Sequence, residues 1–548
     1  MVASACLLLE HAATASQRFE GDWRGFMRLD LDGDGCISFD EYLIANTGDT
    51  INSIQTNGFV TVLRSEPHKP LLPSHVPEIP KREQNDSEAK FRMLTADDGE
   101  ASSWSPKSTL RWSRSEEPFD LSAASSGSAA VYNETSLNEA IQDAAVETIT
   151  VQSDIRLSHV LNEISYRSLA IIGECPDALC EITAGHKSKI FILINAVVTL
   201  KLLRLTEGNA TGDVVTSAES CGGAAWVRQS ILQIKNCTFF NNTARNSGGA
   251  LYVEGSTVLV EDSVFEHNTA QDVYAEPIGG GAVYTYQGVN NFTNCHFAYN
   301  SAGYLGGAIY AQINEFYLYS SSLHHNKAFQ AGGALYVMFL EPASNEIVSC
   351  DFRHNEVINE DSWGGAVAFD TQYPYFMQVN IRTSNFSYNS AESNGGAISC
   401  IPPVMVKACV ISHNIANLSI SGGGGLYTAN HVSSYDSVWT YNQAADGGAI
   451  FSHNEAVIDG GDAAHNRASG TAGAFYSDLL TIRNTVIRHN VAPFGGGAVV
   501  TSRALDIDQS ELSFNKCEAG NGGAILVQGG YSSDIVIRAS LLTSNEAT

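Results

Sequence analysis

The sequence predicts an all-β fold in which short strands wind into a parallel β-helix of stacked coils. Three features of the 548-residue chain predict it: a glycine pair recurs along most of the chain, an apolar-x-x-Asn pattern precedes the pairs, and apolar and polar residues alternate between them. Repeats of about 20–50 residues are typical of stacked units that are each too small to bury an apolar face alone. The alternation, as in STVLVEDSVF at 256–265, indicates strands rather than helices.

The recurring glycine pair, called the glycine mark below, sets the length of the sequence repeat. Its copies lie 23 to 32 residues apart, and a small or apolar residue and often an aromatic one follow, as in GGALY at 248–252. A glycine pair permits a tight bend where a Cβ atom would collide with the next coil. The second glycine of each pair, or its equivalent, is Gly223, Gly249, Gly281, Gly307, Gly333, Gly365, Gly396, Gly425, Gly448, Gly473, Gly497 and Gly523.

The apolar-x-x-Asn pattern, called the asparagine mark below, occurs in twelve copies. Its apolar residue is expected to point into the core, while Asn tolerates a left-handed bend and can join its copies in an amide ladder. A repeat of about 27 residues suits three short strands and three bends, with coils about 4.8 Å apart. The copies are Phe239/Asn242, Phe265/Asn268, Phe297/Asn300, Leu323/Asn326, Phe352/Asn355, Phe386/Asn389, Ile411/Asn414, Trp439/Asn442, Ala463/Asn466, Ile487/Asn490, Leu512/Asn515 and Leu542/Asn545.

The coupled FxxN and GGA(I/L/V) signatures resemble the repeats of polymorphic outer membrane proteins, in the right-handed β-helix (pectin-lyase-like) superfamily. The resemblance covers residues 133–548 and implies a right-handed parallel β-helix of about 12 or more coils, secreted or surface-displayed and often adhesive. Residues 136–145 have an N-cap and helical spacing, and a helix at this place covers the first coil in such folds. Because no glycine pair follows Asn545, we expect a β-helix truncated in mid-coil.

A calcium site is predicted in residues 1–48, which have a helix-loop-helix pattern. Laid on the EF-hand loop, Asp30, Asp32 and Asp34 supply carboxylates, and a glycine makes the sharp turn that follows them. Cys36 offers its backbone carbonyl, Ser38 acts through water and Glu41 closes the site with both carboxylate oxygens. The alternative is an acidic surface turn, and the sequence shows no second loop to pair with this one.

Residues 49–132 are predicted to be a flexible linker, first Pro-rich and then Ser/Ala-rich.

The N-terminal residues do not decide whether the chain begins with a signal peptide. An apolar run at 2–9 and an Ala-Thr-Ala sequence at 13–15 favour one, but Glu10 and His11 interrupt the pattern and no basic residue precedes it. An extracellular or cell-surface location is predicted, with the cytoplasm as the alternative. Eight glycosylation sequons favour secretion: Asn85, Asn133, Asn209, Asn236, Asn241, Asn291, Asn385 and Asn417.

Two further features favour an extracellular binding protein. A net charge of −28 argues against nucleic acid as a partner, and glycans or cell-surface proteins are the expected partners. Cys175 and Cys180 are spaced to close a small loop by a disulfide in an oxidising compartment.

The apolar segment at 190–205 is too short and polar for a membrane span, and its β-branched residues favour buried strands.

Histidine often stands directly before the repeat asparagine, and tyrosine fills the same place in other coils. A pair such as His465 and His489 is close enough to share a metal, but an outward bend that favours planar polar side chains is the preferred interpretation. The histidines are His267, His325, His354, His413, His465 and His489, and the tyrosines are Tyr299, Tyr388 and Tyr441. Cys237, Cys295, Cys350 and Cys409 alternate with serine, so they are interpreted as small interior residues.

These patterns predict calcium binding through one EF-hand, attached to a non-catalytic, adhesin-like β-helix. The alternative is a carbohydrate-active enzyme, either a polysaccharide lyase or a glycoside hydrolase. Such enzymes need clustered carboxylates with a nearby cation. The nearest candidates, Asp459/Asp462 and Asp506/Asp508 with Arg483 or Arg503, do not form such a motif.

Overall fold

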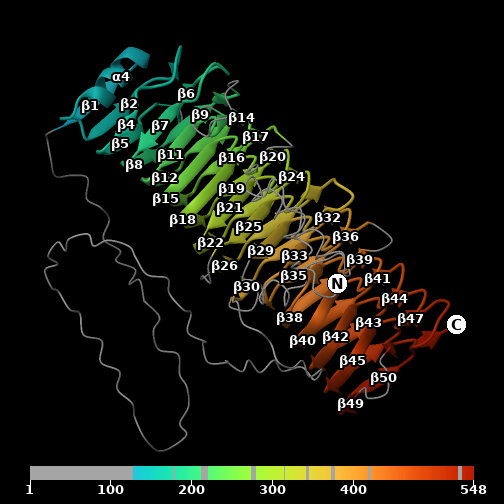
Figure 1. Cartoon of the computed structure of the whole chain (residues 1–548). Coiled ribbons are helices and arrows are strands. Elements are labelled where there is room, and N and C mark those ends of the chain that lie inside the picture. Colours follow the sequence, from blue (N-terminus) through green and yellow to red (C-terminus); the bar gives the residue numbers. More distant parts are fainter. Residues whose placement is uncertain are drawn as a thin grey trace, which may run out of the picture. The chain divides into compact units, whose positions relative to one another are not determined.

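The structure is a computed structural model. It describes residues 127–176, 179–211, 220–272, 279–313, 315–340, 345–371, 377–417, 421–528 and 534–548. Among these, parallel strands stack into a long solenoid that runs from β1 to β51 (Figure 1). The predicted EF-hand region and nearly all of the predicted linker lie outside the described residues.

One coil illustrates the repeat. It consists of β21 (Ile309–Ile313), β22 (Glu315–Tyr319), β23 (Ser322–His324) and β24 (Lys327–Ala328), which form four successive faces. Each residue pairs in parallel with its counterpart one coil away, as Tyr310 does with Tyr336. The sequence predicted three strands in a coil. The additional strand is only two residues long, too short to show as an alternating pattern.

The first face follows the glycine pair. It contains β4 (Ile164–Ser165), β7 (Phe191–Ile194), β11 (Ala225–Arg228), the first parts of β15 (Leu251–Glu261) and β18 (Val283–Thr293), β21, β25 (Leu335–Phe339), β29 (Val367–Thr371), β33 (Ile398–Cys400), β37 (Leu426–Thr428), the first parts of β40 (Ile450–Ala464), β42 (Phe475–Arg483) and β45 (Val499–Asp508), and β48 (Ile525–Val527). The second face contains β1 (Ser128–Val131), β2 (Thr148–Val151), β5 (Ser168–Gly173), β8 (Val197–Lys201), β12 (Ile231–Lys235), the ends of β15 and β18, β22, β26 (Asn345–Val348), β30 (Val379–Arg382), β34 (Val404–Lys407), the start of β38 (Val432–Thr440), the middle of β40, the ends of β42 and β45, and β49 (Asp534–Arg538).

The third face ends at the bend that carries the asparagine mark. It contains β3 (Ile155–Arg156), β6 (Cys180–Thr183), β9 (Leu203–Thr206), β13 (Thr238–Phe240), β16 (Val264–Glu266), β19 (His296–Ala298), β23, β27 (Asp351–Arg353), β31 (Asn385–Ser387), β35 (Val410–Ser412), the ends of β38 and β40, β43 (Val486–Arg488), β46 (Glu511–Ser513) and β50 (Leu541–Thr543). The fourth face is a separate sheet of two-residue strands: β10 (Asn209–Ala210), β14 (Thr243–Ala244), β17 (Thr269–Ala270), β20 (Ser301–Ala302), β24, β28 (Glu356–Val357), β32 (Ser390–Ala391), β36 (Ile415–Ala416), β39 (Gln443–Ala444), β41 (Arg467–Ala468), β44 (Val491–Ala492), β47 (Lys516–Cys517) and β51 (Glu546–Ala547).

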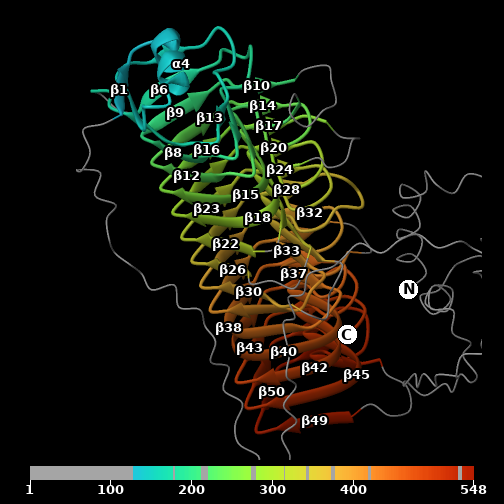
Figure 2. The ribbon, with the colours of Figure 1, turned by 60° about the vertical axis from the view of Figure 1, so that its left-hand side comes forward.

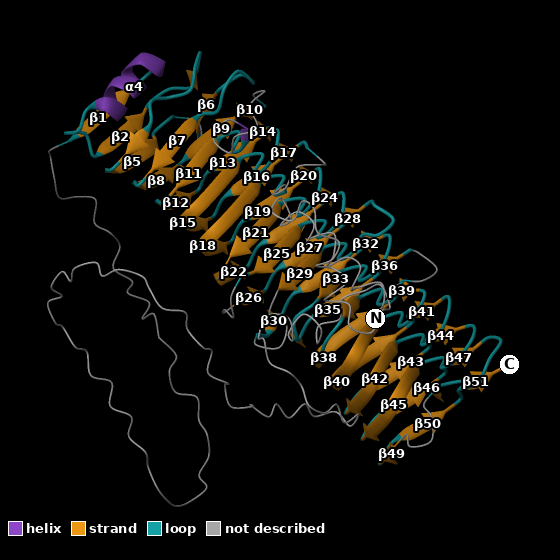
Figure 3. Ribbon diagram, in the orientation of Figure 1, coloured by secondary structure: helices purple, strands orange, loops and turns teal. Residues whose placement is uncertain are grey.

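Helix α4 (Glu134–Gln142) covers the N-terminal end of the solenoid, beside β1 and β2 (Figures 2 and 3). Its buried residues Leu137, Ala140 and Ile141 join the core of the first coil. The expected capping helix is therefore confirmed, but its start is shifted. Asn133 is the N-cap and Ser136 completes a capping box from the third helical position, which satisfies backbone N–H groups at the helix start.

The apolar residues of the asparagine mark form a buried column, as predicted, except that Leu542 of the last copy is exposed. The rings of Phe239, Phe265 and Phe297 stack on one another at centroid distances of 4.6 and 4.8 Å, and Phe352 stacks on Phe386 at 4.7 Å. Each of these side chains is fully buried. The segment at 190–205 forms β7, β8 and β9 as expected, and no helix of the described residues is long and apolar enough to cross a membrane.

The predicted amide ladder is present at all twelve asparagines. Each of the first eleven donates from Nδ2 to the Oδ1 atom of the next copy at 3.0–3.1 Å, from Asn242 through to Asn515, and Asn545 accepts the last of these bonds. Nδ2 also donates to a backbone carbonyl, as from Asn355 to Leu323, and Oδ1 also accepts a backbone N–H, as Asn355 does from Asn326. The buried amides are therefore saturated with hydrogen bonds.

The glycine pairs close the coil as expected. Gly332 has φ of +61°, and a Cβ atom on Gly333 would lie 2.1 Å from the carbonyl oxygen of Gly365 in the next coil. The first position needs left-handed backbone, which Ala472 adopts in one coil, and the second needs the absence of a side chain, so glycine is required most strictly at the second.

Candidate functional site

A column of stacked rings runs along the outside of the bend between the third and fourth faces. Neighbouring ring centroids are 4.7–5.1 Å apart, and neighbouring ring planes lie within 22° of parallel. We call this column the ring ladder; its members are His267, Tyr299, His325, His354, Tyr388, His413, Tyr441, His465, His489 and Phe514. About half of the Tyr299, Tyr388 and Tyr441 surface is exposed.

The backbone explains why these rings point outward. Every member of the ring ladder has a left-handed φ between 53° and 59°, and the next residue is the inward asparagine. Left-handed backbone costs roughly 1–2 kcal/mol for a residue with a side chain. An aromatic pair returns about 0.5–1.5 kcal/mol beyond its buried area, and each inner ring has two such neighbours. Stacking therefore offsets the cost of the bend.

A hollow of about 420 Å³ adjoins the middle of the ring ladder. Rings from Tyr299 to Tyr388 form one side, and Lys327 and Glu356 of the fourth face form the other. The Lys327 Nζ atom lies 2.6 Å from Glu356 Oε1, in an exposed ion pair. The hollow thus combines ring edges with one cation and one anion.

The stacking decides what the ring ladder offers to a ligand. Because ring faces cover one another, only ring edges with imidazole nitrogens and phenol oxygens are available along its length. These groups donate and accept hydrogen bonds. Burial, followed by the neighbouring histidine and arginine, lowers the pKa of His325 and of His465 below the ordinary value. Both rings are therefore neutral at pH 7 and can act as acceptors.

The alternative of a metal shared by stacked histidines does not fit this geometry. The His465 and His489 rings are 5.0 Å apart with planes only 2° from parallel. Imidazole lone pairs lie in the ring plane, so the lone pairs of two parallel rings cannot converge on one ion at the usual bond length of about 2.0–2.1 Å. The structure supports the preferred interpretation of an outward bend with planar side chains.

The predicted calcium ligands Asp30, Asp32, Asp34, Cys36, Ser38 and Glu41 lie outside the described residues. They stay a prediction. Within the described ranges, no group of three or more His, Cys, Asp or Glu side chains is placed to hold a metal.

The cysteine column lies inside the bend between the second and third faces. Cys237, Cys295, Cys350 and Cys409 are buried, and each donates its backbone N–H to a serine hydroxyl of the next coil at 3.0–3.2 Å. Burial raises the pKa of the Cys295 thiol to about 12. These thiols are small interior residues, as predicted.

The carboxylates considered for catalysis are held in separate exposed contacts. Asp506 lies 2.9 Å from Arg538 and 3.9 Å from Arg483. Asp462 pairs with Arg488 at 2.8 Å, and Asp459 accepts a hydrogen bond from Asn484. Arg503 pairs with Asp478. Arg483 pairs in register with Asp459 of one neighbouring coil and with Asp508 of the other, so these two carboxylates lie on opposite sides of the cation rather than next to each other.

One arrangement that the sequence did not suggest has the order of a catalytic triad. His431 Nε2 lies 2.6 Å from the Ser433 hydroxyl, and His431 Nδ1 lies 3.3 Å from Glu455 Oε2. The second contact is a charge contact only, because Nδ1 is buried without an aligned hydrogen-bond partner. A catalytic base needs that bond to fix its tautomer and orientation, so the geometry does not support an activated serine.

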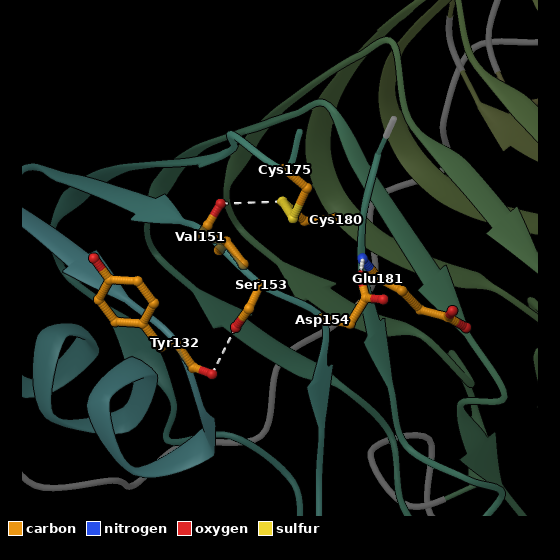
Figure 4. The surroundings of a disulfide bond; sticks show 7 residues. All are labelled: Tyr132, Val151, Ser153, Asp154, Cys175, Cys180 and Glu181. Carbon is orange, nitrogen blue, oxygen red and sulfur yellow. Dashed lines mark hydrogen bonds between the residues drawn. A yellow bond between two sulfur atoms is a disulfide. The ribbon is translucent and has the colours of Figure 1, made fainter. Parts of the chain in front are cut away.

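The predicted small loop is closed by a disulfide between Cys175 and Cys180 (Figure 4). The loop joins β5 to β6, and Asp154 Oδ1 accepts the backbone N–H of Glu181 beside it. A disulfide is typical of an oxidising compartment. Among the sequons in the described residues, Asn133 and Asn417 are exposed.

The stacking, the hollow and the paired charges beside it were not predicted. The signal that located the ring ladder was the planar residue before each repeat asparagine. Whether such residues stack depends on the register of successive bends, which sequence periodicity does not give.

Residues 222–401 match the family model described as a right handed beta helix region. No curated protein matches the chain. Among solved structures, "L. reuteri 53608 SRRP" matches over 76% of this chain and 99% of that chain, with 12% identity and a TM-score of 0.15. Nothing is inferred from so low a TM-score. The family match and the parallel coils together identify the repeat region as a right-handed β-helix.

Proposed function

We propose that this chain is a non-catalytic binding protein that holds extended, uncharged glycans along the ring ladder. The observation that carries the proposal is the unbroken, outward-facing row of ring edges from His267 to Phe514, with a hollow at its middle. Such a row suits an elongated ligand better than a compact one.

The spacing of the rings favours a glycan. Polar ring edges recur every 4.7–5.1 Å, a distance comparable to the length of one sugar ring in an extended polysaccharide. Sugar hydroxyls both donate and accept hydrogen bonds, as tyrosine hydroxyls and neutral imidazoles do. A net charge of −28 disfavours polyanions, which makes uncharged polysaccharides the expected class.

Binding to soluble mannan, xylan and β-glucan tests the proposal, with affinity electrophoresis of the full chain as the readout. Replacing Tyr299, Tyr388 and Tyr441 together by Ala should weaken binding roughly 100-fold, because three hydroxyl contacts of about 1 kcal/mol each are lost. Tyr166→Ala is the matched control, since Tyr166 is also exposed and left-handed but lies outside the ring ladder. Equal binding by the triple variant, or no binding by the native chain, would contradict the proposal.

The same incubations separate binding from catalysis. A non-catalytic protein releases no unsaturated or reducing ends above a heat-inactivated control. Release of such ends, with or without Ca²⁺, would favour a lyase or hydrolase instead.

The EF-hand at Asp30–Glu41 is part of the same proposal. Its donor set of three aspartates, a carbonyl, a water-bridging serine and a bidentate glutamate suits a seven-oxygen Ca²⁺ site. Without a paired loop its affinity is expected at the weak end, about 10⁻⁵ to 10⁻³ M, where extracellular calcium fills it. In calorimetry on the full chain, Glu41→Gln should weaken binding far more than Ser38→Ala. If no heat of binding were measured at millimolar Ca²⁺, the loop would have lost its calcium-binding function.

An extracellular or surface location belongs to the proposal too. The Cys175–Cys180 disulfide and the exposed sequons support it. Glycosidase treatment of native protein should lower its mass, and Asn133→Gln or Asn417→Gln should reduce that shift. A native protein without any glycan would weaken the assignment.

A further inference from the structure

Two consecutive histidines beside the hollow face each other. The Nδ1 atoms of His324 and His325 are 3.0 Å apart, and their ring planes are nearly perpendicular at 88°. Stacked pairs of the ring ladder have nearly parallel planes, whereas in this pair the two Nδ1 atoms lie within hydrogen-bond distance of each other.

The fold brings these two rings together. His324 ends strand β23 and its side chain lies on the outer surface, half-buried beside His296 and Tyr299 at centroid distances of 4.7 and 5.8 Å. His325 begins the bend with φ of 53°, which redirects its ring along the ring ladder. The left-handed bend thus turns two successive side chains towards one point.

The contact between the two Nδ1 atoms is one that a metal ion could replace. A hydrogen bond at this 3.0 Å distance needs a proton on one of the two Nδ1 atoms and a lone pair on the other. A metal bound by both atoms would displace that proton and take a lone pair from each ring.

The nitrogen separation discriminates between coordination geometries. Two metal–nitrogen bonds of about 2.0–2.1 Å place the nitrogens about 2.9 Å apart at a right angle and about 3.3 Å apart in a tetrahedron. The observed 3.0 Å is closer to the right angle. Tetragonal nitrogen sites favour Cu²⁺ or Ni²⁺, and Cu²⁺ binds more tightly in general.

We infer that the Nδ1 atoms of His324 and His325 form a Cu²⁺ site as adjacent equatorial ligands, with water in the other positions. The inference does not rest on the proposed calcium loop or on glycan binding, although His325 is also a member of the ring ladder. Arg353 is a cation that pairs in register with His324 one coil away, and its guanidinium is engaged by Asp351 at 2.7 Å. With only two protein ligands, the site should bind Cu²⁺ reversibly.

The test is a Cu²⁺ titration of the full chain in saturating Ca²⁺, followed by electron paramagnetic resonance. One Cu²⁺ signal with hyperfine coupling to two nitrogens is expected. His324→Ala should remove that signal or weaken its binding roughly ten-fold or more, by analogy with the loss of even outer partners at metal sites. His325→Ala should do the same.

The double variant His465→Ala/His489→Ala is the control, because it removes two stacked histidines of the same bend. Its two-nitrogen signal should be unchanged. The inference is overturned if His324→Ala and His325→Ala keep the native signal, or if the stacked-pair variant loses it. Equal far-UV circular dichroism of all variants excludes unfolding as the cause, and His324→Gln provides a second, polar replacement.

Discussion

Two rows of side chains run along the same bend, one on each side of the backbone. The inner row consists of twelve asparagines joined by amide hydrogen bonds, all buried except Asn545, and the outer row is the ring ladder. The inner position is occupied by asparagine in all twelve copies. The outer one is histidine, tyrosine or phenylalanine in ten copies and is Asn241 or Ser544 in the first and last.

The difference teaches what each position requires. An inner side chain must donate twice and accept twice in fixed directions without water, and only a primary amide of this length does so. An outer side chain needs only a flat surface that stacks and a backbone that tolerates positive φ. Identity is therefore demanded inside, while the outer row is open to variation in chemistry.

A charge introduced on the inner side of the bend should cause the largest loss of folding stability. Phe352→Asp places a carboxylate in a fully buried column against Phe386, where it has no partner. An unpaired buried charge typically costs several kcal/mol. Urea unfolding should therefore show a large loss of stability, with Phe352→Leu as a mild control. Equal melting of Phe352→Asp and the native chain would mean that Phe352 does not face the core.

Loss of one amide should have the next largest effect. Asn355→Leu keeps the approximate size but removes the acceptor of one Nδ2 hydrogen and of the backbone N–H of Asn326, and the side-chain donor to the carbonyl of Leu323. Each unsatisfied buried group costs about 1–3 kcal/mol, so a loss of about 3 kcal/mol or more is expected in urea unfolding. A loss below that of His354→Ala, its outer neighbour, would contradict the ranking of the two rows.

The outer side should respond to pH where the inner side does not. In the folded chain the pKa of His324 is about 4, below its ordinary value of 6.5. Burial lowers this pKa most, followed by His296, His325 and Arg353, whereas Asp351 raises it. Between these pH values the unfolded chain binds more protons, so stability should fall as pH drops from 6.5 towards 4. In thermal melts across this range, His324→Asn should lose less stability than the native chain. Parallel melting curves would exclude this coupling.

Most of the fold could be predicted from the glycine and asparagine marks. The stacked Phe column and the amide ladder follow directly from positions such as Phe352 and Asn355, because burial and hydrogen bonding constrain residue type. Residue type alone could not place the hollow or the meeting of His324 with His325, which depend on how successive bends align. Helix α4 shows the intermediate case, since its existence was predicted but its cap, Asn133, was not. The EF-hand prediction stands on sequence alone.

The smallest effect should come from exchange within the outer row, and Tyr388 is the place to measure it. Its ring stacks between His354 and His413 at 5.1 and 4.7 Å. Tyr388→Ala removes both contacts and should cost about 1–2 kcal/mol. Tyr388→Val should cost more, because a β-branched residue is strained at positive φ.

Tyr388→His should be nearly neutral, within about 0.5 kcal/mol, because histidine already occupies this bend in neighbouring coils. At pH 7 its ring can stack as the tyrosine does, while at pH 5 it would add a charge between His354 and His413 and should become destabilising. Equilibrium unfolding of the three variants at both pH values decides the point. If Tyr388→His and Tyr388→Ala were equally unstable at pH 7, the hydroxyl rather than the stacked ring would stabilise the outer row, and the two rows would differ less than their burial suggests.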